Sequence, residues 1–580
     1  MVIVAWSRAA VDSDWVRDEA AFGRDHGQLV PLQLDDTEPP LGFRQYQLVK
    51  FSTWNGRPEE PEIASLIAAI DAPCERVDPP TSPGPRARGM PANRRSLLLS
   101  AAVAFPALAG GAWWWFGLRQ TPAPLHSIAV LPFANMSGDA SQDYFSDGLS
   151  EELINALARL KPLQVVGRTS AFKFKGSKAG SSEIGAKLGV AHLLDGSVRR
   201  ERTLVRVSTQ LVEAKTGFEV WSQTFDRDMK DILVVQSEIA QAVAEALKVR
   251  LLGADIAAFT LGGASNDQAY DDFLRGRCLF DVGGGEEAYR SALARFDAAI
   301  AGDPGFAAAH AARARTLLTV ANQFTPPERL RQAYAAALAS ARRAVTLAPG
   351  LAEAQATLAS VLENGFLDFA AAKLAFGRAM ATGEGNADIL TRFGQFSCEI
   401  GEFDPGLAAV RRAAVLDPLN PRVFRSLGYA LIGAKDYAGA IVAMRRALAL
   451  SPKAEGAHAA IGDALLLQGD LTGARAEYPL EPLAWLRLTG QAILLRRLGD
   501  GPGADAAFKA LKADGDSVTL YQQAQVYAQW GDADHAVAAL AAAYKSGDSG
   551  IVLMKSDAMM DPLRADPRFT QLIKQLGLGA

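Results

Sequence analysis

Small residues and prolines recur at a fixed interval in the C-terminal half of the chain. The interval is thirty-four residues, and it relates Gly394, Gly428 and Gly462, then Ala379, Ala413 and Ala447, and then Pro418 and Pro452. A period of this length predicts a repeated pair of helices. Small residues then lie where the paired helices cross, and a proline follows the second helix because it cannot continue that helix.

The same frame extends over residues 266–580. Second-helix positions outside the clearest repeats are Ala292, Phe296, Ala299 and Pro304, then Ala337, Ala344 and Pro349, then Ala372 and Phe376, and later Ala474, Tyr478, Ala504, Phe508, Tyr527, Ala536 and Leu540. Seven or eight repeats result. The pattern resembles the tetratricopeptide repeat (TPR), whose arrays form a superhelix with a concave face for peptides or protein segments.

Five side chains on the predicted first helices are candidates for partner binding. They are Arg422, Arg425 and Tyr429, with Gln395 and Asp463 at equivalent places. A solvated face without a fixed partner is the alternative for each of them. The carboxylate clamp of chaperone-binding TPR proteins has an asparagine where this chain has Gln395, Tyr429 and Asp463, so binding of chaperone C-termini is disfavoured.

Residues 125–250 alternate between short apolar runs and amphipathic stretches. Strands are expected at Ser127–Phe133, Leu163–Phe174, Leu193–Val198, Val205–Val212 and Glu219–Phe225, and helices at Asp147–Leu160, Ser182–Leu188 and Asp231–Val249. The turn Glu213–Gly217 joins the last two strands as a hairpin. The segment is therefore predicted to be a small α/β domain.

This domain resembles the TolB-N-like domain, which is related to FlgO. The resemblance rests on SIAVLPFANMSGDASQDYFSDGLSEELINALARL, VVGRTSAFKFKG, LLDGSVRR and GFEVWSQTFDR. It implies a binding or assembly module and not an enzyme. The acidic residues around Asp147 and Glu151 are explained by turns and by the start of a helix, where carboxylates are stabilised.

The first 72 residues alternate strand, helix, strand and helix. Val2–Val4 and Leu29–Leu32 are predicted strands, whereas Asp14–Gly23 and Ile63–Ile70 are predicted helices. This alternation is typical of part of an α/β layer.

The same segment resembles the C-terminal portion of a bacterial TIR domain, from its third strand to its last helix. Ser7, Ser13, Trp15, the Pro39–Phe43 loop and Trp54 occur in family order. TIR domains associate with one another and transmit signals, and some cleave NAD. In those enzymes a glutamate after the tryptophan of this helix is catalytic, which by position implies Glu19. An acidic residue on a solvated helix start is the alternative, and the first two strands of the family are missing here.

A long apolar run separates these two regions. Leu97–Leu118 contains no charged residue and ends near three consecutive tryptophans, Trp113–Trp115. A helix of this length spans about 33 Å, close to the hydrocarbon thickness of a bilayer. We therefore predict a transmembrane helix at 96–118. A processed twin-arginine export signal and a buried helix are the alternatives.

The cations around this run predict an orientation. Arg86, Arg88, Arg94 and Arg95 precede it within a Pro/Arg-rich linker at 73–95, and Arg119 alone follows closely. The positive-inside rule then places the N-terminus in the cytoplasm and the C-terminal region in the periplasm. A single-pass protein of the inner membrane, in contact with the lipid bilayer, is predicted.

The composition and the motifs of the chain argue against several classes of function. The formal net charge is -4, and no concentrated basic segment suggests a nucleic-acid partner. The three cysteines are far apart, and the histidines form no metal-binding motif. No phosphate-binding glycine loop is present. We expect no metal and no cofactor.

The combined prediction is a multidomain α/β plus α-solenoid protein: a partial TIR-like layer at 1–72, a single transmembrane helix, a small α/β domain and a TPR superhelix. Its expected function is that of a membrane-anchored signalling or scaffold protein that binds proteins or peptides through the TPR groove, with other TIR domains as further partners. One alternative is a TIR-family NAD nucleosidase regulated by the exported region, with NAD as substrate only. Another is an envelope assembly factor with a vestigial TIR segment.

Overall fold

The computed structural model describes residues 2–6, 29–35, 37, 49–50 and 124–578, apart from 203, 250–258, 260, 284 and 516–518. The chain divides into two compact units, Met1–Trp115 and Phe116–Ala580. The predicted transmembrane segment, its flanking linker and Glu19 lie outside the described residues.

The first unit contains a parallel sheet with the strand order β1-β2-β3. Its strands are β1 (Val2–Trp6), β2 (Leu29–Gln33) and β3 (Val49–Lys50). The two strands expected from the apolar runs are confirmed, and β1 pairs with β2 from Val2 opposite Leu29 to Trp6 opposite Gln33. The two helices predicted between and after these strands lie outside the described residues.

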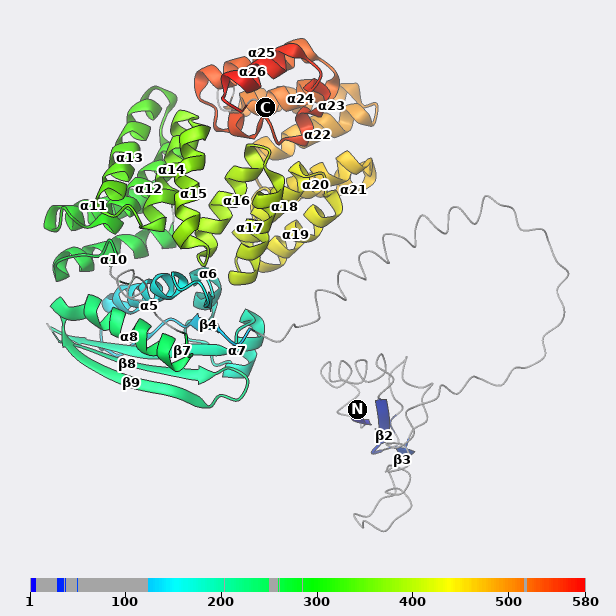
Figure 1. Ribbon diagram of the computed structural model, residues 1–580. Coiled ribbons are helices and arrows are strands. Elements are labelled where there is room, and N and C mark those ends of the chain that lie inside the picture. Colours follow the sequence, from blue (N-terminus) through cyan, green and yellow to red (C-terminus); the bar gives the residue numbers. More distant parts are fainter. Residues whose placement is uncertain are drawn as a thin grey trace. The chain divides into compact units, whose positions relative to one another are not determined.

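The second unit begins with an α/β domain of two layers (Figure 1). Its sheet has the order β6-β4-β7-β8-β9, and the short β5 (Ala134–Asn135) also pairs with β7. The strands are β4 (Ser127–Val130), β6 (Gln164–Val165), β7 (His192–Glu201), β8 (Leu204–Glu213) and β9 (Glu219–Asp228). Strand β4 is parallel to β6 and β7, whereas β7, β8 and β9 are antiparallel.

Helices cover one face of this sheet. Helix α5 (Asp143–Ala158) packs against β4, and α8 (Ile232–Ala246) packs against α5, β8 and β9. On β8 the side chains alternate accordingly, because Val205, Val207, Thr209 and Leu211 are buried and the residues that alternate with them are more exposed. The period of two expected for a half-covered antiparallel sheet is therefore present.

The strand predicted at Leu163–Phe174 is wrong beyond its first residues. After β6, the chain forms α6 (Arg168–Ala171) and a 3-10 turn at Phe172–Phe174. A distant residue stabilises this helical turn, because the buried Asp417 carboxylate accepts a hydrogen bond from the Ser170 N–H at 2.8 Å. A local alternation of apolar and polar residues cannot reveal such a contact.

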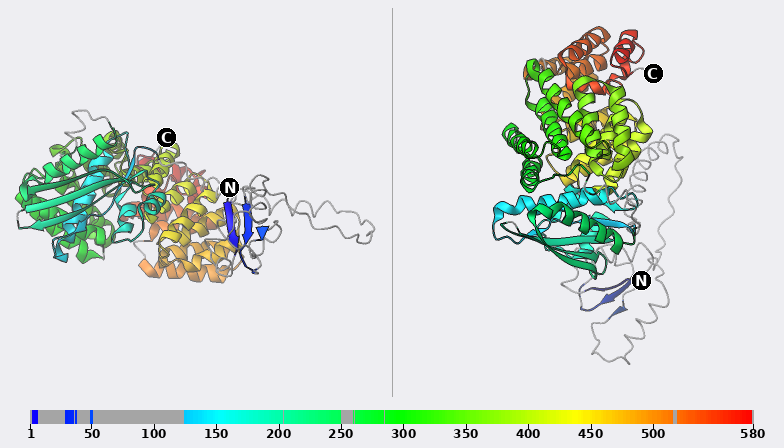
Figure 2. Two further views of the ribbon diagram at one scale, coloured as in Figure 1. Left: turned by 90° about the horizontal axis from the view of Figure 1, so that it is seen from below. Right: turned by 60° about the vertical axis from the view of Figure 1, so that its left-hand side comes forward.

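The rest of the unit is a helical solenoid of eight consecutive helical hairpins within residues 261–578 (Figures 1 and 2). The pairs are α10 (Asp267–Val282) with α11 (Glu286–Gly302), α12 (Ala307–Phe324) with α13 (Pro327–Leu347), α14 (Ala352–Phe366) with α15 (Phe369–Gly383), α16 (Ala387–Glu399) with α17 (Phe403–Leu416), α18 (Pro421–Gly433) with α19 (Tyr437–Leu450), α20 (Ala457–Gln468) with α21 (Leu471–Glu477), α22 (Ala484–Arg497) with α23 (Gly501–Gly515) and α24 (Leu520–Trp530) with α25 (Ala533–Ser546). The predicted TPR array is confirmed as this solenoid.

The thirty-four-residue period has a direct structural cause. A Cβ atom added at Gly428 would lie 2.7 Å from Met444, and one added at Gly462 would lie 2.6 Å from Tyr478. Gly394 makes the same approach to Val410. At each position the first helix meets the second so closely that a larger side chain would push the pair apart.

The C-terminal segment returns to the middle of the array. It contains two 3-10 segments, Ser549–Leu553 and Ala558–Leu563, followed by α26 (Pro567–Gln575). Ile551, Val552 and Met554 belong to one buried cluster with Phe376 and Phe396 of the third and fourth hairpins. The eighth hairpin is therefore held against the middle of the same array.

The predicted location needs correction. In the part of the chain that the structure describes, no helix is both long enough and apolar enough to cross a bilayer. The prediction of a single-pass inner-membrane protein with a periplasmic C-terminal region is therefore not retained.

Candidate functional site

The first helices of successive hairpins form one continuous layer. Helix α12 packs against α14, and α14, α16, α18, α20, α22 and α24 continue this row. We call the surface of this row that faces away from the second helices the inner face. It carries four of the five side chains predicted to bind partners, all except Asp463, and several further charged groups.

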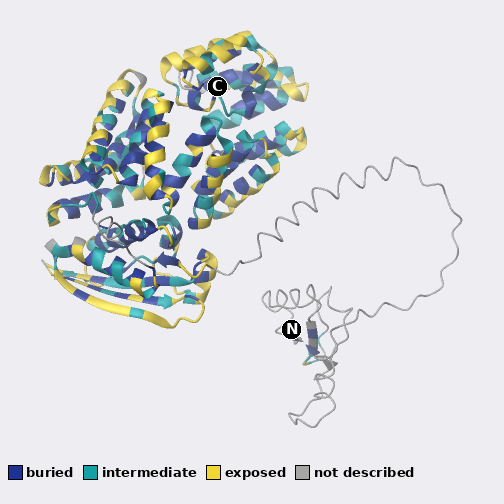
Figure 3. Cartoon of the chain, viewed as in Figure 1, coloured by how far each residue is buried: buried dark blue, intermediate teal, exposed yellow. Residues whose placement is uncertain are grey.

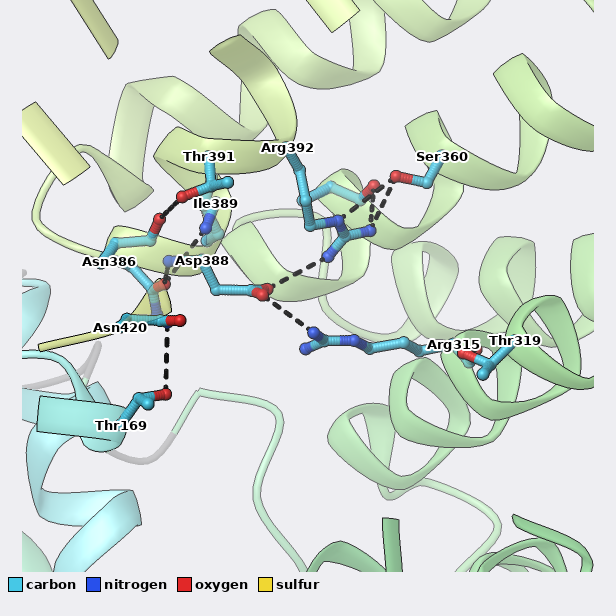
Figure 4. A network of polar contacts seen from close by, with 12 residues as sticks. Thr169, Arg315, Thr319, Ser360, Asn386, Asp388, Ile389, Thr391, Arg392 and Asn420 are labelled. Carbon is cyan, nitrogen blue, oxygen red and sulfur yellow. Dashed lines mark hydrogen bonds and ion pairs between the residues drawn. The ribbon is translucent and has the colours of Figure 1, made fainter. Parts of the chain in front are cut away.

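An ion-pair network lies on the inner face where α12, α14 and α16 meet (Figure 4). An Nη of Arg315 donates to Asp388 at 2.8 Å, and Arg392 lies 3.6 Å from the other oxygen of the same carboxylate. Arg392 also donates to the Ala356 carbonyl at 2.7 Å and to the Ser360 hydroxyl at 3.0 Å. Two guanidinium groups thus share one carboxylate.

Water reaches this network although protein surrounds it. The Arg315 and Asp388 side chains are 38% and 45% exposed. Burial nevertheless lowers the pKa of Arg392 to about 10, with repulsion from Arg315 acting in the same direction. Burial would raise the pKa of Asp388, but Arg315 and Arg392 outweigh it and hold that pKa below its usual value. This combination is expected on a concave wall, where side chains are accessible and still partly desolvated.

The predicted residues of α18 lie on the inner face, and two of them contact the next hairpin. Arg425 donates to the Glu455 carbonyl at 3.0 Å, and the Tyr429 hydroxyl donates to the Gly456 carbonyl at 3.2 Å. Tyr429 remains 43% exposed, yet the surrounding protein raises the pKa of its hydroxyl to about 12. Arg422 and Gln395 are exposed. The two contacts position α18 against the loop before α20, and Tyr429 remains partly accessible.

Asp463 of α20 is hydrogen-bonded within its own hairpin. The buried Tyr478 hydroxyl donates to the Asp463 carboxylate at 2.8 Å. Burial raises the pKa of Asp463 to about 7, although the Tyr478 hydrogen bond acts in the opposite direction. Of the five predicted residues, Asp463 is therefore the one whose side chain is engaged in the interior of the repeat.

We expect the Asp463→Asn variant to lose part of the pH dependence of stability. The folded pKa of about 7 lies above the unfolded value of about 3.9. The folded protein therefore retains a proton that the unfolded chain releases, and the contribution of this group falls as the pH rises from about 4 to about 7, by at most about 1.4 kcal/mol per pH unit. Urea unfolding at a series of pH values should show wild type losing stability relative to the variant across this window. Parallel curves would contradict the assignment.

Other parts of the unit cover both rims of the inner layer. The rim formed by the loops before α16 and α18 contacts the α/β domain, where the Gly167 N–H donates to the Leu416 carbonyl at 2.7 Å and Lys161 lies 3.4 Å from Glu384. The opposite rim, at the turns after α16 and α18, contacts the C-terminal segment, where Lys435 pairs with Asp561 at 2.7 Å. The loops at both ends of α16 and α18 are therefore held by other parts of the unit.

The α/β domain also places charge beside the first hairpin. Glu151 of α5 pairs with Arg277 of α10 and lies 3.2 Å from Arg168. Burial raises the pKa of Glu152 to about 7, against the attraction of Arg159. The prediction that these acidic residues lie at the start of a helix is wrong for Glu151 and Glu152, because α5 begins at Asp143. Glu151 is instead buried and pairs with an arginine of the solenoid.

The sequence interpretation missed the network around Asp388. Asp388 stands thirty-four residues before Arg422 and four residues before Arg392. The thirty-four-residue period could therefore have predicted that Asp388 lies on the same helix face as Arg422. The spacing of four residues between Asp388 and Arg392 could have predicted an ion pair along one helix. Arg315 had no such signal, since the insertion in the second hairpin shifts the frame there.

Comparison with known proteins finds no matching protein-family model. The curated protein "Putative adenylate cyclase 3" of Rhizobium meliloti (strain 1021) is 37% identical over 220 residues, which are 37% of this chain and 37% of that protein. The chain thus spans well under half the length of this relative.

Among solved structures, the pilF protein of Pseudomonas aeruginosa is 23% identical with a TM-score of 0.29, covering 37% of this chain and 98% of that chain. A thermophilic TPR protein of Thermus thermophilus is 19% identical with a TM-score of 0.29, covering 34% of this chain and 99% of that chain. These scores are low, so the repeat assignment rests on the period and the helical hairpins of this chain itself.

Proposed function

We propose that this chain is a scaffold protein whose solenoid binds an extended segment of a partner protein along the inner face of α16, α18 and α20. The observation that carries this proposal is the geometry at Tyr429, which is 43% exposed while its hydroxyl donates to the Gly456 carbonyl of the next hairpin at 3.2 Å. Accessible aromatic and cationic groups are typical of sites where a few residues supply most of the binding energy.

The contacts around Tyr429 favour a protein segment as the ligand. Arg425 and Tyr429 are fixed by carbonyls of the neighbouring loop, so little side-chain freedom remains to be lost on binding. Arg422 is exposed beside them and Gln395 occupies the equivalent place on α16. An aromatic ring, a guanidinium and an amide in a row can hold both backbone and side chains of an extended peptide.

We further propose that the α/β domain is a non-catalytic, TolB-like part of the same scaffold, and that residues 1–72 form a TIR-like segment that transmits the binding event. The TIR-like proposal is supported by the parallel pairing of β1 and β2, which requires a crossover between them. The similarity to "Putative adenylate cyclase 3" supports the proposal that this chain acts in signalling. The residues that the two proteins share would then form a binding region.

Peptide selection tests the inner face. A phage-displayed random peptide library is panned on the full chain, and the selected peptides are measured against Arg422→Glu and Tyr429→Ala. We expect each variant to weaken binding by about tenfold or more, because an anchor residue contributes more than about 1.4 kcal/mol.

A charge reversal on the second helix of the same hairpin provides the matched control. Arg445 of α19 is exposed, so Arg445→Glu changes net charge equally without altering the inner face. Binding by this variant should equal wild type. Peptides that bind Arg422→Glu and Tyr429→Ala as tightly as wild type, or the recovery of no binding peptide, would refute the proposed site.

A further inference from the structure

Strand β9 forms a long free edge of the α/β sheet. It contains ten residues, Glu219–Asp228, and pairs with β8 on one side. Among the described residues, no strand pairs with its other side. Most of its length is exposed (Figure 3). The unpaired N–H and C=O groups of such an edge are a template for another strand.

The edge also carries exposed apolar surface at its start. Phe218 is 75% exposed and Val220 is 45% exposed. Most of the remaining side chains of β9 are exposed as well, whereas Phe225 is buried against the helix-covered face. The edge is therefore accessible along its whole length, in contrast to β6 at the other edge, which has only two residues.

Three pairs of β9 residues are complementary about Gln223. The order is Glu219, Val220, Trp221, Ser222, Gln223, Thr224, Phe225, Asp226 and Arg227. When a second copy of the strand runs antiparallel with Gln223 opposite Gln223, Glu219 falls opposite Arg227. Trp221 falls opposite Phe225, and Ser222 falls opposite Thr224. Opposite charges, two aromatic rings and two hydroxyls are the pairs that stabilise neighbouring antiparallel strands.

The pleat of the sheet is consistent with this register. Arg227, Phe225 and Trp221 stand opposite Val205, Val207 and Leu211 of β8, on the face that the helices cover. The two rings therefore lie on one face, and the two hydroxyls lie on the other. The register with β8 shifts between Leu211 and Val212, so that Glu219 stands opposite Val212 beyond the irregularity, and Arg227 pairs with Glu238 of α8 at 3.2 Å. The pair between Glu219 and Arg227 of the second copy therefore forms only when Arg227 turns from Glu238 to the new strand. Val220 falls opposite Asp226, whose carboxylate remains paired with Arg206 of β8 at 2.6 Å.

We propose that β9 pairs with β9 of a second copy of this chain, antiparallel and centred on Gln223, so that the two sheets become one. Charged residues on an edge strand often prevent such pairing. Here the charges have opposite signs and lie four residues on either side of Gln223, which a merely protective function does not require. A two-fold axis through Gln223 makes each complementary pair occur twice.

Charge reversal with rescue tests the proposal on the full chain. Sedimentation velocity should detect a dimer for wild type. Glu219→Arg and Arg227→Glu should each shift the population to monomer, because each places like charges opposite one another. The double variant Glu219→Arg with Arg227→Glu should restore the dimer. Lys215→Glu, an exposed charge reversal in the turn before β9, should leave it unchanged.

Cross-linking tests the register independently of the charge variants. Under mild oxidation, Gln223→Cys should form an intermolecular disulfide, since only the central residue faces itself across the axis. Lys215→Cys should not, and wild type measures the background from the native cysteines. A monomeric wild type, a dimer insensitive to both single reversals, a double variant that stays monomeric, or the absence of cross-linking at Gln223→Cys would overturn the proposal.

Discussion

Replacing Tyr478 with alanine is expected to lower the free energy of unfolding of the C-terminal repeats by about 3–5 kcal/mol. The Tyr478 side chain is fully buried, and its ring lies between Gly462 of α20 and Gly490 of α22. Removal of the ring leaves a cavity between two helices whose glycines cannot fill it. Chemical denaturation, followed by the fluorescence of Trp485 and Trp530 near this cluster, measures the loss.

The Tyr478→Phe variant separates the packing of the ring from its hydrogen bond. Phenylalanine retains the ring and removes only the bond to Asp463, so a loss of about 1 kcal/mol is expected. A loss as large as that of alanine would show that the hydroxyl, and not the packed ring, stabilises these repeats. A loss below about 1 kcal/mol for alanine would show that the helices close over the cavity.

Replacing Asp417 with alanine is expected to cost about 2–3 kcal/mol and to loosen the α/β domain from the solenoid. The buried Asp417 carboxylate accepts hydrogen bonds from the Ser170 N–H at 2.8 Å, the Ser170 hydroxyl at 2.5 Å and the Asn420 amide at 2.7 Å. Alanine leaves the two buried donors of Ser170 without this acceptor, whereas the Asn420 amide keeps its hydrogen bond to the Thr169 hydroxyl. Thermal unfolding measures the loss, and hydrogen exchange should increase in α6 and in the loop before α18.

Asp404 provides the matched control for this experiment. It lies in α17 of the same hairpin and is exposed, so Asp404→Ala should change stability by less than about 0.5 kcal/mol. Equal effects of the two substitutions would contradict the assignment of Asp417 as the residue that joins the α/β domain to the array. Burial raises the pKa of Asp417 in spite of its three hydrogen bonds.

The repeat architecture was predictable because one physical requirement recurs along the sequence. Gly428 must leave room for Met444, and Gly462 must leave room for Tyr478, so the spacing of close crossings appears directly in the residues. The strands at Val2–Val4 and Leu29–Leu32 were predictable for a similar reason, since short apolar runs bounded by polar residues fill a buried layer.

Contacts between distant segments were not predictable. The strand expected at Leu163–Phe174 ends at Val165, because Ser170 is held in a helical turn by a carboxylate from the fourth hairpin. The return of Ile551 and Val552 to the third and fourth hairpins is equally invisible in a local pattern. Each of these contacts depends on the curvature of the whole array, which no window of the sequence contains.

The candidate site was predictable in part. The frame placed Arg422, Arg425 and Tyr429 on the first helix of a hairpin, where the structure has them. It did not predict that Arg425 and Tyr429 bind carbonyls of the next loop, or that Asp463 accepts a hydrogen bond from Tyr478. Periodicity identifies the helix face, whereas the partner of each side chain depends on the neighbouring repeat.

Hydrogen exchange of the full chain, with and without a peptide selected on it, tests most directly whether the inner face is the binding surface. The account predicts that bound peptide slows exchange in α16, α18 and α20, and leaves the second helices α17 and α19 unchanged. Protection confined to the second helices or to the α/β sheet, with α16, α18 and α20 unaffected, would contradict it.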